Sequence, residues 1–240
     1  MSELIIPDSR FEMPSLQYPN RKPVGNVKID WGHPLAKKLQ FLYLGGYVDL
    51  VSGDVGEIVN GAYPHRGDLD ASMGAAGNGP NKPSIRFPTL SKGGDVTVLS
   101  ISSLVGSTNT GNMRLYDNKD SYSAADGFYL GISITGHAEI RGGGGSYTIK
   151  ESAIEPHKFN VLVTRYTGSQ VELFENSALK HAATIGAISS VGKPITIAHD
   201  YGNTTYGYDG IIKAIAFFDT LSDAEICSLS ASPYQFLITV

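Results

Sequence analysis

The chain has 240 residues, of which 41% are hydrophobic and only 18% are charged, and it contains 28 glycines. This composition is typical of a β protein with many turns and is unlike that of a helical or disordered chain. The formal net charge is −4 and no basic stripe is visible, which argues against nucleic acid as a partner. A single cysteine, Cys227, excludes an internal disulfide. No apolar run is long enough to cross a membrane, so we expect no membrane partner.

The first 25 residues differ from the rest of the chain because they are rich in proline and follow no hydrophobic period. Proline fixes φ and removes a backbone donor, so we expect an extended arm over residues 1–25. The arm is more apolar than a solvated tail requires. It therefore either binds a partner chain or folds back over its own domain. Its candidate partner-binding residues are Leu4, Ile5, Ile6, Phe11, Leu16 and Tyr18.

Residues 26–240 are predicted to form one domain in which short strands alternate with turns. Pro34 is expected to open one helical turn before a strand around Phe41–Leu44, and "GDLDASMGAAGNGPNKP" is expected to be a loop. Further strand-like runs are "SIRF", "DVTVLSISSLV", "GFYLGISI", "HAEIRGGGG", "SYTI", "KFNVLVTRY", "QVELFEN", "PITIAHD" and "DGIIKAIAFFD". Strands of this length, separated by turn residues, predict an antiparallel two-sheet sandwich.

One short helix is expected near the C-terminus. Ser222 is the predicted N-cap, and Glu225, three residues later, completes a capping box. Leu221 and Ile226 occupy the two positions of a hydrophobic staple. Cys227 falls beside the apolar face, so we expect a small, half-buried side chain there rather than a reactive thiol.

Four segments of the domain carry a resemblance to a known family: "YGYDGIIKAIAFFDTLSDAEICSL", "VELFENSAL", "IDWGHPLAKKLQFLYL" and "ASPYQFL". The first resembles the ending of concanavalin A-like, laminin-G-like jelly-roll domains, and the second resembles their strand that ends in an Asn-Gly turn, with Ser177 in place of the glycine. The other two are similar to segments of the versions found in tailed-bacteriophage virion proteins. The match spans about residues 27–237 and leaves the arm outside.

The resemblance implies a jelly roll of two antiparallel sheets, each of six or seven strands, with one sheet concave and loops at its rim. In relatives the rim or the concave face can bind sugars, and some members hold calcium. Other relatives are enzymes, and many make only structural contacts. The fold alone therefore does not decide the function.

No pair of carboxylates in the sequence is placed as a glycosidase requires. Glu172 and Glu175 are three apart, hence on opposite faces of a strand, and Asp68 and Asp70 fall in the predicted glycine-rich loop. The six histidines show no zinc-ligand spacing. We therefore expect a protein that is not an enzyme.

The loop "HDYGNTTYGYDG" is the best candidate for ligand binding. Its tyrosines could stack on sugar rings while its polar side chains bind hydroxyls; the alternative is a hairpin turn whose tyrosines pack on the rim. The candidate glycan-binding residues are Asp200, Tyr201, Asn203, Tyr206, Tyr208 and Asp209. Asp200 and Asp209 are also weak calcium candidates, although Lys213 places a cation where the family often has an acidic residue.

These features together predict a non-enzymatic structural protein of a bacteriophage virion, made in the host cytoplasm because the N-terminus lacks a secretory signal. We expect a capsid decoration protein that docks partly through its arm on the major capsid protein or another virion protein. A homo-oligomer is expected, with a trimer as one option. The alternative is a lectin-like module on the virion surface or tail that binds glycans.

Overall fold

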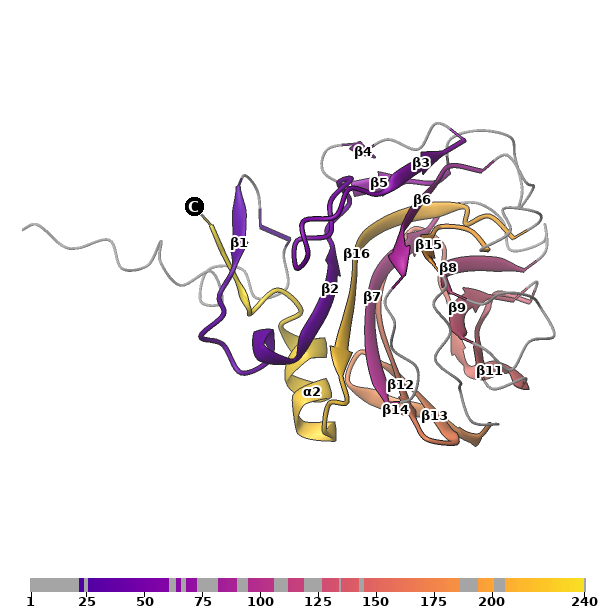
Figure 1. Cartoon of the computed structure of the whole chain (residues 1–240). Coiled ribbons are helices and arrows are strands. Elements are labelled where there is room, and N and C mark those ends of the chain that lie inside the picture. Colours follow the sequence, from indigo (N-terminus) through magenta and orange to yellow (C-terminus); the bar gives the residue numbers. More distant parts are fainter. Residues whose placement is uncertain are drawn as a thin grey trace, which may run out of the picture.

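Two antiparallel sheets face each other and enclose the main core (Figure 1). The computed structural model describes residues 22–23, 26–60, 64–65, 68–72, 82–89, 95–105, 112–118, 127–133, 135–142, 145–185, 194–200 and 206–239. Within these residues the chain is an antiparallel β-sandwich with a single α-helix, which confirms the predicted fold class. The proposed arm falls almost entirely outside them, and no described helix is long and apolar enough to span a membrane.

The first sheet, called here the front sheet, has seven strands. Their order is β11 (Gly145–Ala153), β10 (His137–Gly142), β9 (Phe128–Ile132), β8 (Met113–Asp117), β15 (Pro194–Ile197), β6 (Ser84–Thr89) and β3 (Glu57–Val59). Phe128, Leu130 and Ile132 of β9 point into the core. Because side chains alternate along a strand, Tyr129 and Gly131 belong to the outer face.

The second sheet, called here the back sheet, has eight strands. Its path is β14 (Ala178–Thr184), β13 (Gln170–Glu175), β12 (Phe159–Thr167), β7 (Val96–Leu104), β16 (Gly210–Asp219), β5 (Asp68–Asp70) and β4 (Pro64–His65), and β2 (Leu39–Tyr43) also pairs with β16. Aromatic rings fill the space between the sheets. The centroids of Phe41 and Phe217 are 5.4 Å apart, and those of Phe128 and Tyr166 are 4.6 Å apart.

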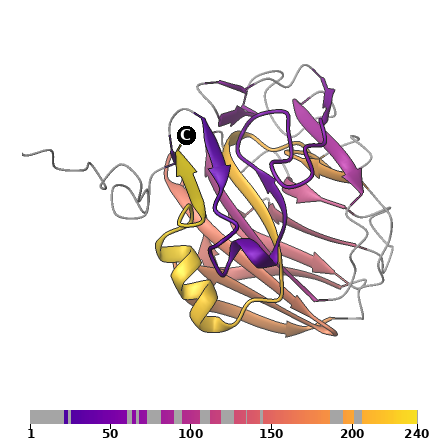
Figure 2. The same ribbon diagram turned by 60° about the vertical axis from the view of Figure 1, so that its left-hand side comes forward.

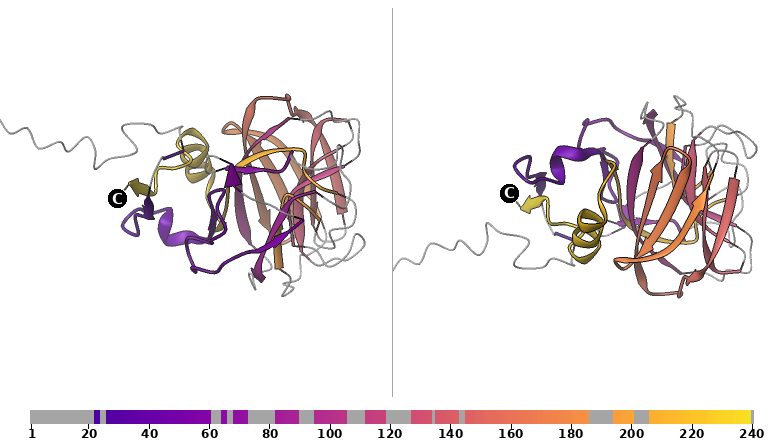
Figure 3. Two further views of the ribbon diagram at one scale, coloured as in Figure 1. Left: turned by 90° about the horizontal axis from the view of Figure 1, so that it is seen from above. Right: turned by 90° about the horizontal axis from the view of Figure 1, so that it is seen from below.

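The outer face of the back sheet is also covered. Helix α2 (Asp223–Ala231), the short 3-10 helix η2 (Ala36–Lys38) and a two-stranded sheet of β1 (Val27–Ile29) and β17 (Leu237–Thr239) lie on that side (Figures 2 and 3). Ala216 and Phe218 of β16 belong to the same buried cluster as Ile226 and Leu229 of α2, while Phe217 belongs to the main core. Both faces of β16 are therefore buried, which explains why its sequence "AIAFF" is continuously apolar.

The ends of the elements follow local chemistry as predicted. The Ser222 side chain accepts a hydrogen bond from Glu225 N, Glu225 caps the Ser222 backbone in return, and Leu221 and Ile226 are fully buried. Between β13 and β14, Asn176 has φ 49° and Ser177 has φ 74°. Positive φ at both central residues is the geometry of an Asn-Gly hairpin turn, so the serine occupies a position that favours glycine.

Two local predictions were wrong. Cys227 is exposed rather than half-buried, because the helix turns this residue away from the sheet and only Ile226, Leu229 and Ser230 are buried. Asp68 and Asp70 were expected in a loop but lie on β5, which pairs with β16 and supplies the hydrogen bonds that a strand needs.

Candidate functional site on the outer face of the front sheet

Polar and charged side chains gather on the outer face of the front sheet. This set, called here the polar face, alternates along its strands with core residues such as Leu130 and Ile140. A solvated sheet face would leave such groups exposed, yet Arg114 is 1% exposed and Glu139 4%. Charged groups are buried this deeply only when they are paired. The residues of the polar face are Arg86, Arg114, Asp117, Tyr129, Glu139, Arg141 and Thr196.

The strand register sets these residues in rows across the sheet. One row runs from Arg114 on β8 through Gly131 on β9 to Glu139 on β10. The neighbouring row joins Thr196, Asp117, Tyr129 and Arg141 on four successive strands. Residues that face each other in register are close enough to interact, so the sheet pairing itself assembles the cluster.

Gly131 leaves the space that the Arg114 side chain uses. A Cβ at this position would lie 2.1 Å from Met113 O and 3.0 Å from Arg114 Nη1. Without a side chain in the way, Arg114 reaches over β9, and its Nη2 lies 3.9 Å from Glu139 Oε1.

Arg114 is the centre of the polar face. Its Nε lies 3.9 Å from Asp117 Oδ2, so two carboxylates share one guanidinium. The Arg114 Cζ atom is 3.6 Å from the centroid of the Tyr129 ring, within the range of a cation–π contact. The hydroxyl of Tyr129 in turn donates to Glu139. The charges are thus paired with each other and with an aromatic ring.

The predicted glycan-binding loop meets this cluster at Tyr206. The backbone N of Arg114 donates to Tyr206 O over 3.1 Å, and the Arg114 Cζ atom lies 4.7 Å from the centroid of the half-buried Tyr206 ring. Asp200 accepts from Tyr206 N at 3.5 Å and is hydrogen-bonded to the ring of His199. The structure therefore brings two of the predicted residues, Asp200 and Tyr206, to the edge of the polar face.

The other two described residues of the predicted set lie elsewhere. Tyr208 is fully buried in the core, and burial raises the pKa of its hydroxyl well above the ordinary value. Its ring has no surface for stacking on a sugar, contrary to our expectation. Asp209 pairs with Lys82: the Nζ atom lies 3.2 Å from Asp209 Oδ1, and the Lys82 side chain is 1% exposed. This carboxylate neutralises a buried cation.

Both calcium candidates, Asp200 and Asp209, interact with cationic or histidine side chains. Asp209 is occupied by Lys82 and Asp200 by His199, and they do not form a shared oxygen cage. In the part of the chain that the structure describes, no group of three or more His, Cys, Asp and Glu side chains could hold a metal ion. Lys213, the cation expected to disfavour a metal here, belongs to β16, and its Nζ lies 3.6 Å from the centroid of the Phe159 ring.

The remaining candidates lie outside the described residues. They are Tyr201 and Asn203 of the loop and Leu4, Ile5, Ile6, Phe11, Leu16 and Tyr18 of the arm.

Sequence reasoning missed the polar face because its members are far apart in the chain. Glu139 and Arg141 alternate with Ala138 and Ile140 in "HAEIR", a pattern that predicts an ordinary solvated strand face. One signal could have pointed to the cluster. Charged residues recur on the outer face of neighbouring strands, and one strand of this group, β9, carries a glycine, Gly131, on the same face.

Comparisons with known proteins identify the fold. No family model matches the chain, and a search of curated proteins finds no match. Among solved structures, domain 4 of the arabinanase AbnA from Geobacillus stearothermophilus, solved in complex with arabinotriose, has a TM-score of 0.59 at 14% identity; the match covers 80% of this chain and 98% of that one. These levels of identity show a shared β-sandwich fold.

Two larger proteins contain a similar domain. Trypanosoma rangeli sialidase matches with a TM-score of 0.62 at 14% identity, over 82% of this chain and 33% of the sialidase. The binding domain of botulinum neurotoxin serotype D matches with a TM-score of 0.58 at 15% identity, over 82% of this chain and 52% of that domain. This chain therefore spans about a third and about half of these two structures.

Proposed function

We propose that this chain is a carbohydrate-binding module that holds its glycan at the edge of the polar face, where Tyr206 and Asp200 lie. The observation that carries the proposal is the support beneath Tyr206: Arg114 donates to its backbone and contacts its ring. An aromatic ring held rigidly beside polar groups is the usual platform for a sugar ring. Tyr206 and Asp200 would contact the glycan, and Arg114 would position them.

Two of the proteins with a similar fold were solved with a bound carbohydrate, which supports this proposal. The arabinanase domain was solved with arabinotriose, and one structure of the sialidase was solved with sialic acid. We further propose that the fold belongs to the concanavalin A-like group, because the terminal helix, its capping box and the Asn176–Ser177 turn stand where the sequence resemblance places them.

We infer that the module is not catalytic. Asp117 and Glu139 both lie against Arg114, and Glu139 also accepts from Tyr129. Both carboxylates are buried, Asp117 being 5% and Glu139 4% exposed, and both face the same guanidinium. A glycosidase needs two carboxylates that face an open cleft and are free to act on the substrate. An assay for reducing ends released from common β-glucans and arabinans tests this point, and turnover by the purified chain would contradict it.

A glycan array tests the binding function. The wild-type chain is expected to bind at least one class of glycan, and Tyr206→Ala is expected to lose that binding while its melting temperature stays close to that of the wild type. Tyr47→Ala, a change of the same kind on another half-buried tyrosine, is the matched control and should keep the binding. An array without any hit would refute the proposal.

A structural role in a phage virion is the second candidate. It is favoured by the position of Lys22, whose Nζ donates to Leu44 O at 2.6 Å and to Asp68 at 2.7 Å. The chain is thus fixed to the domain at Lys22, near the C-terminal end of the proposed arm, and all six candidate docking residues precede this point. Trp31, which is 52% exposed, adds apolar surface after β1.

Deletion of residues 1–20 tests the virion role, because it removes most of the arm, including all six candidate docking residues, and leaves Lys22 in place. The shortened chain should keep its thermal stability and lose its binding to phage particles or to their major capsid protein. Full occupancy of the particles by the shortened chain would contradict docking through the arm. Size-exclusion chromatography with light scattering would show whether a homo-oligomer, such as a trimer, forms.

A further inference from the structure

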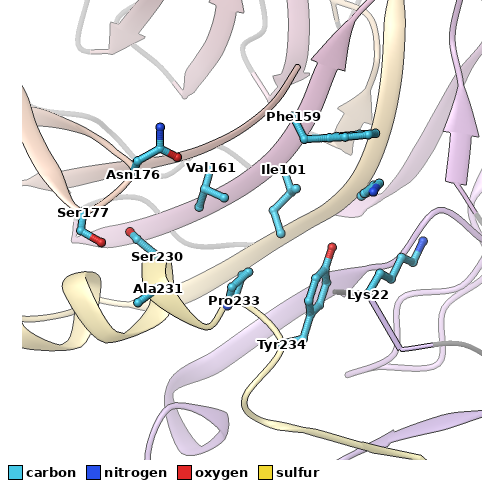
Figure 4. A pocket seen from close by; sticks show the side chains of 11 residues that line it. Lys22, Ile101, Phe159, Val161, Asn176, Ser177, Ser230, Ala231, Pro233 and Tyr234 are labelled. Atoms are coloured by element: carbon cyan, nitrogen blue, oxygen red, sulfur yellow. The ribbon is translucent and has the colours of Figure 1, made fainter. Parts of the chain in front are cut away.

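A pocket of about 380 Å³ opens on the outer face of the back sheet, beside the end of α2 (Figure 4). Ile101 of β7 and Val161 of β12 form its floor, and Phe159, Pro233 and Tyr234 form its walls. This volume is within the range of small-molecule sites, about 300–1,000 Å³. The pocket lies on the sheet opposite to the polar face and is independent of it.

Two buried hydroxyl groups of the pocket have no hydrogen-bond partner among the residues that the structure describes. Tyr234 is 5% exposed and Ser230 is 7% exposed, and neither the Oη nor the Oγ atom finds a donor or acceptor. In Figure 4 the hydroxyl of Tyr234 points toward the side of the pocket where Ile101 and Phe159 lie. Burial raises the pKa of Tyr234, so this hydroxyl stays protonated at neutral pH. A buried polar group without a partner costs stability, which suggests that a ligand completes the site.

The pocket also carries a positive charge that no described carboxylate pairs with. Lys213 Nζ lies 3.6 Å from the centroid of the Phe159 ring, and no described carboxylate forms an ion pair with it. Lys22, on the other side, already binds Asp68 at 2.7 Å. Phe159 is 40% exposed, so the ring beneath Lys213 still has surface for a ligand. The free charge at this pocket therefore belongs to Lys213.

We propose that this pocket binds a small organic carboxylate with a flat apolar body, such as an aromatic monocarboxylic acid. The carboxylate would pair with Lys213 and accept from the Tyr234 hydroxyl, since both are donors that lack an anionic partner. The body would lie on Ile101 and Val161 and against the Phe159 ring. A sugar fits the floor of this pocket less well, because the Ile101 and Val161 side chains offer no hydrogen bonds for a ring of hydroxyl groups. The polar side chains Asn176, Ser177 and Ser230 lie at one end of the pocket (Figure 4).

Calorimetric titration of the full chain tests the proposal with three probes. Sodium benzoate is expected to bind. Benzamide has the same shape without the charge and should bind at least about tenfold more weakly, because a charge-assisted hydrogen bond is lost. Sodium glucuronate carries the charge on a polar body and should show no measurable binding. Absence of benzoate binding at millimolar concentration, or equal binding of benzamide or glucuronate, would overturn the proposal.

Substitutions locate the site. Lys213→Gln should weaken benzoate binding about tenfold or more, whereas Lys37→Gln, the same change at an exposed lysine on η2, should leave it unchanged. Tyr234→Phe should also weaken binding, while the free protein stays at least as stable as the wild type, because the removed hydroxyl has no partner in the described part of the chain. If Lys213→Gln binds benzoate as tightly as the wild type does, benzoate binds elsewhere and the assignment is refuted, whatever the result for Tyr234→Phe.

Discussion

Arg114 and Glu139 approach to 3.9 Å although a whole strand, β9, runs between them. The contact exists because the residue of β9 that lies in register with both is Gly131. A buried guanidinium thus meets its carboxylate over a position without a side chain. This relationship holds the polar face together and fixes Tyr206 at its edge.

Gly131→Ala should destabilise the protein, because the added Cβ would lie 2.1 Å from Met113 O and 3.0 Å from Arg114 Nη1. Overpacking of this kind typically costs about 1–3 kcal/mol, so we expect a fall of about 2 kcal/mol in the free energy of unfolding, measured with urea. Gly46→Ala is the control, since nothing lies within 4 Å of its Cβ. A Gly131→Ala variant as stable as the Gly46→Ala variant would contradict this account of the cluster.

Asp209→Asn should be strongly destabilising, because it leaves the buried Lys82 ammonium without its opposite charge. Breaking one side of a buried pair costs about 3–5 kcal/mol. The double variant Lys82→Met/Asp209→Asn should recover part of that loss, because neither charge remains. A double-mutant cycle measured by chemical denaturation checks this. Purely additive losses would show that the two groups do not depend on each other.

Ser177→Gly should stabilise the hairpin between β13 and β14. Ser177 has φ 74°, a conformation that costs a residue with a side chain about 1–2 kcal/mol relative to glycine. We expect a gain of about 0.5–1 kcal/mol after the greater backbone freedom of glycine in the unfolded chain is subtracted. Ser169→Gly changes an exposed turn serine without positive φ and should show no gain. A lower melting temperature for Ser177→Gly than for the wild type would refute the prediction.

Glu225 should make the helix end sensitive to acid. Hydrogen bonds from Lys38 Nζ, at 2.7 and 2.8 Å, and from the backbone of Ser222 lower the pKa of Glu225 below its ordinary value of 4.5. Because the folded-state pKa is the lower one, the stabilisation is complete above about pH 4.5 and is lost as the pH falls through the lowered value.

Unfolding free energies measured between pH 7 and pH 3 check this dependence. Glu225→Gln should flatten the part of the curve below pH 4.5, because the titrating group is gone. Glu155→Gln removes an exposed carboxylate whose partner, Lys158, is 63% exposed, and it should keep the wild-type slope. If the unfolding free energy of Glu225→Gln falls with pH as steeply as that of the wild type, the contacts of residue 225 with Lys38 and Ser222 do not depend on the charge of Glu225.

Local chemistry explains why much of the fold could be predicted. The cap at Ser222, the turn at Ser177 and the helical turn after Pro34 depend on residues within a few positions of one another. The strands of the sandwich follow from alternation and turn residues, which are also local. Asp68 and Asp70 were misplaced because a strand as short as β5 exists only through its pairing with β16, and a three-residue pattern between glycines cannot show that pairing.

The candidate site could be predicted only in part, because its residues come from distant segments. The sequence pointed to the loop with Asp200 and Tyr206, where polar and aromatic residues are dense. It gave no reason to separate Tyr206 from Tyr208, although the first lies beside Arg114 and the second is buried in the core. Two residues that are two positions apart on an extended segment point to the same side, so alternation alone would place both tyrosines together. In the structure they pair with different segments: Tyr208 N donates to Ala198 O, whereas Tyr206 O accepts from Arg114 N.

The sequence by itself determined the class of the fold, the capped helix at its end and the turns between strands, because each depends on the conformational preferences of neighbouring residues. The tertiary structure decided which polar groups meet: Arg114 with Glu139 across Gly131, Lys82 with Asp209, and Lys213 with Phe159. Those contacts depend on strand order and register, which are set by how the apolar faces of all the strands bury one another at once. That packing brings Lys82 and Asp209 together although they are 127 positions apart in the sequence.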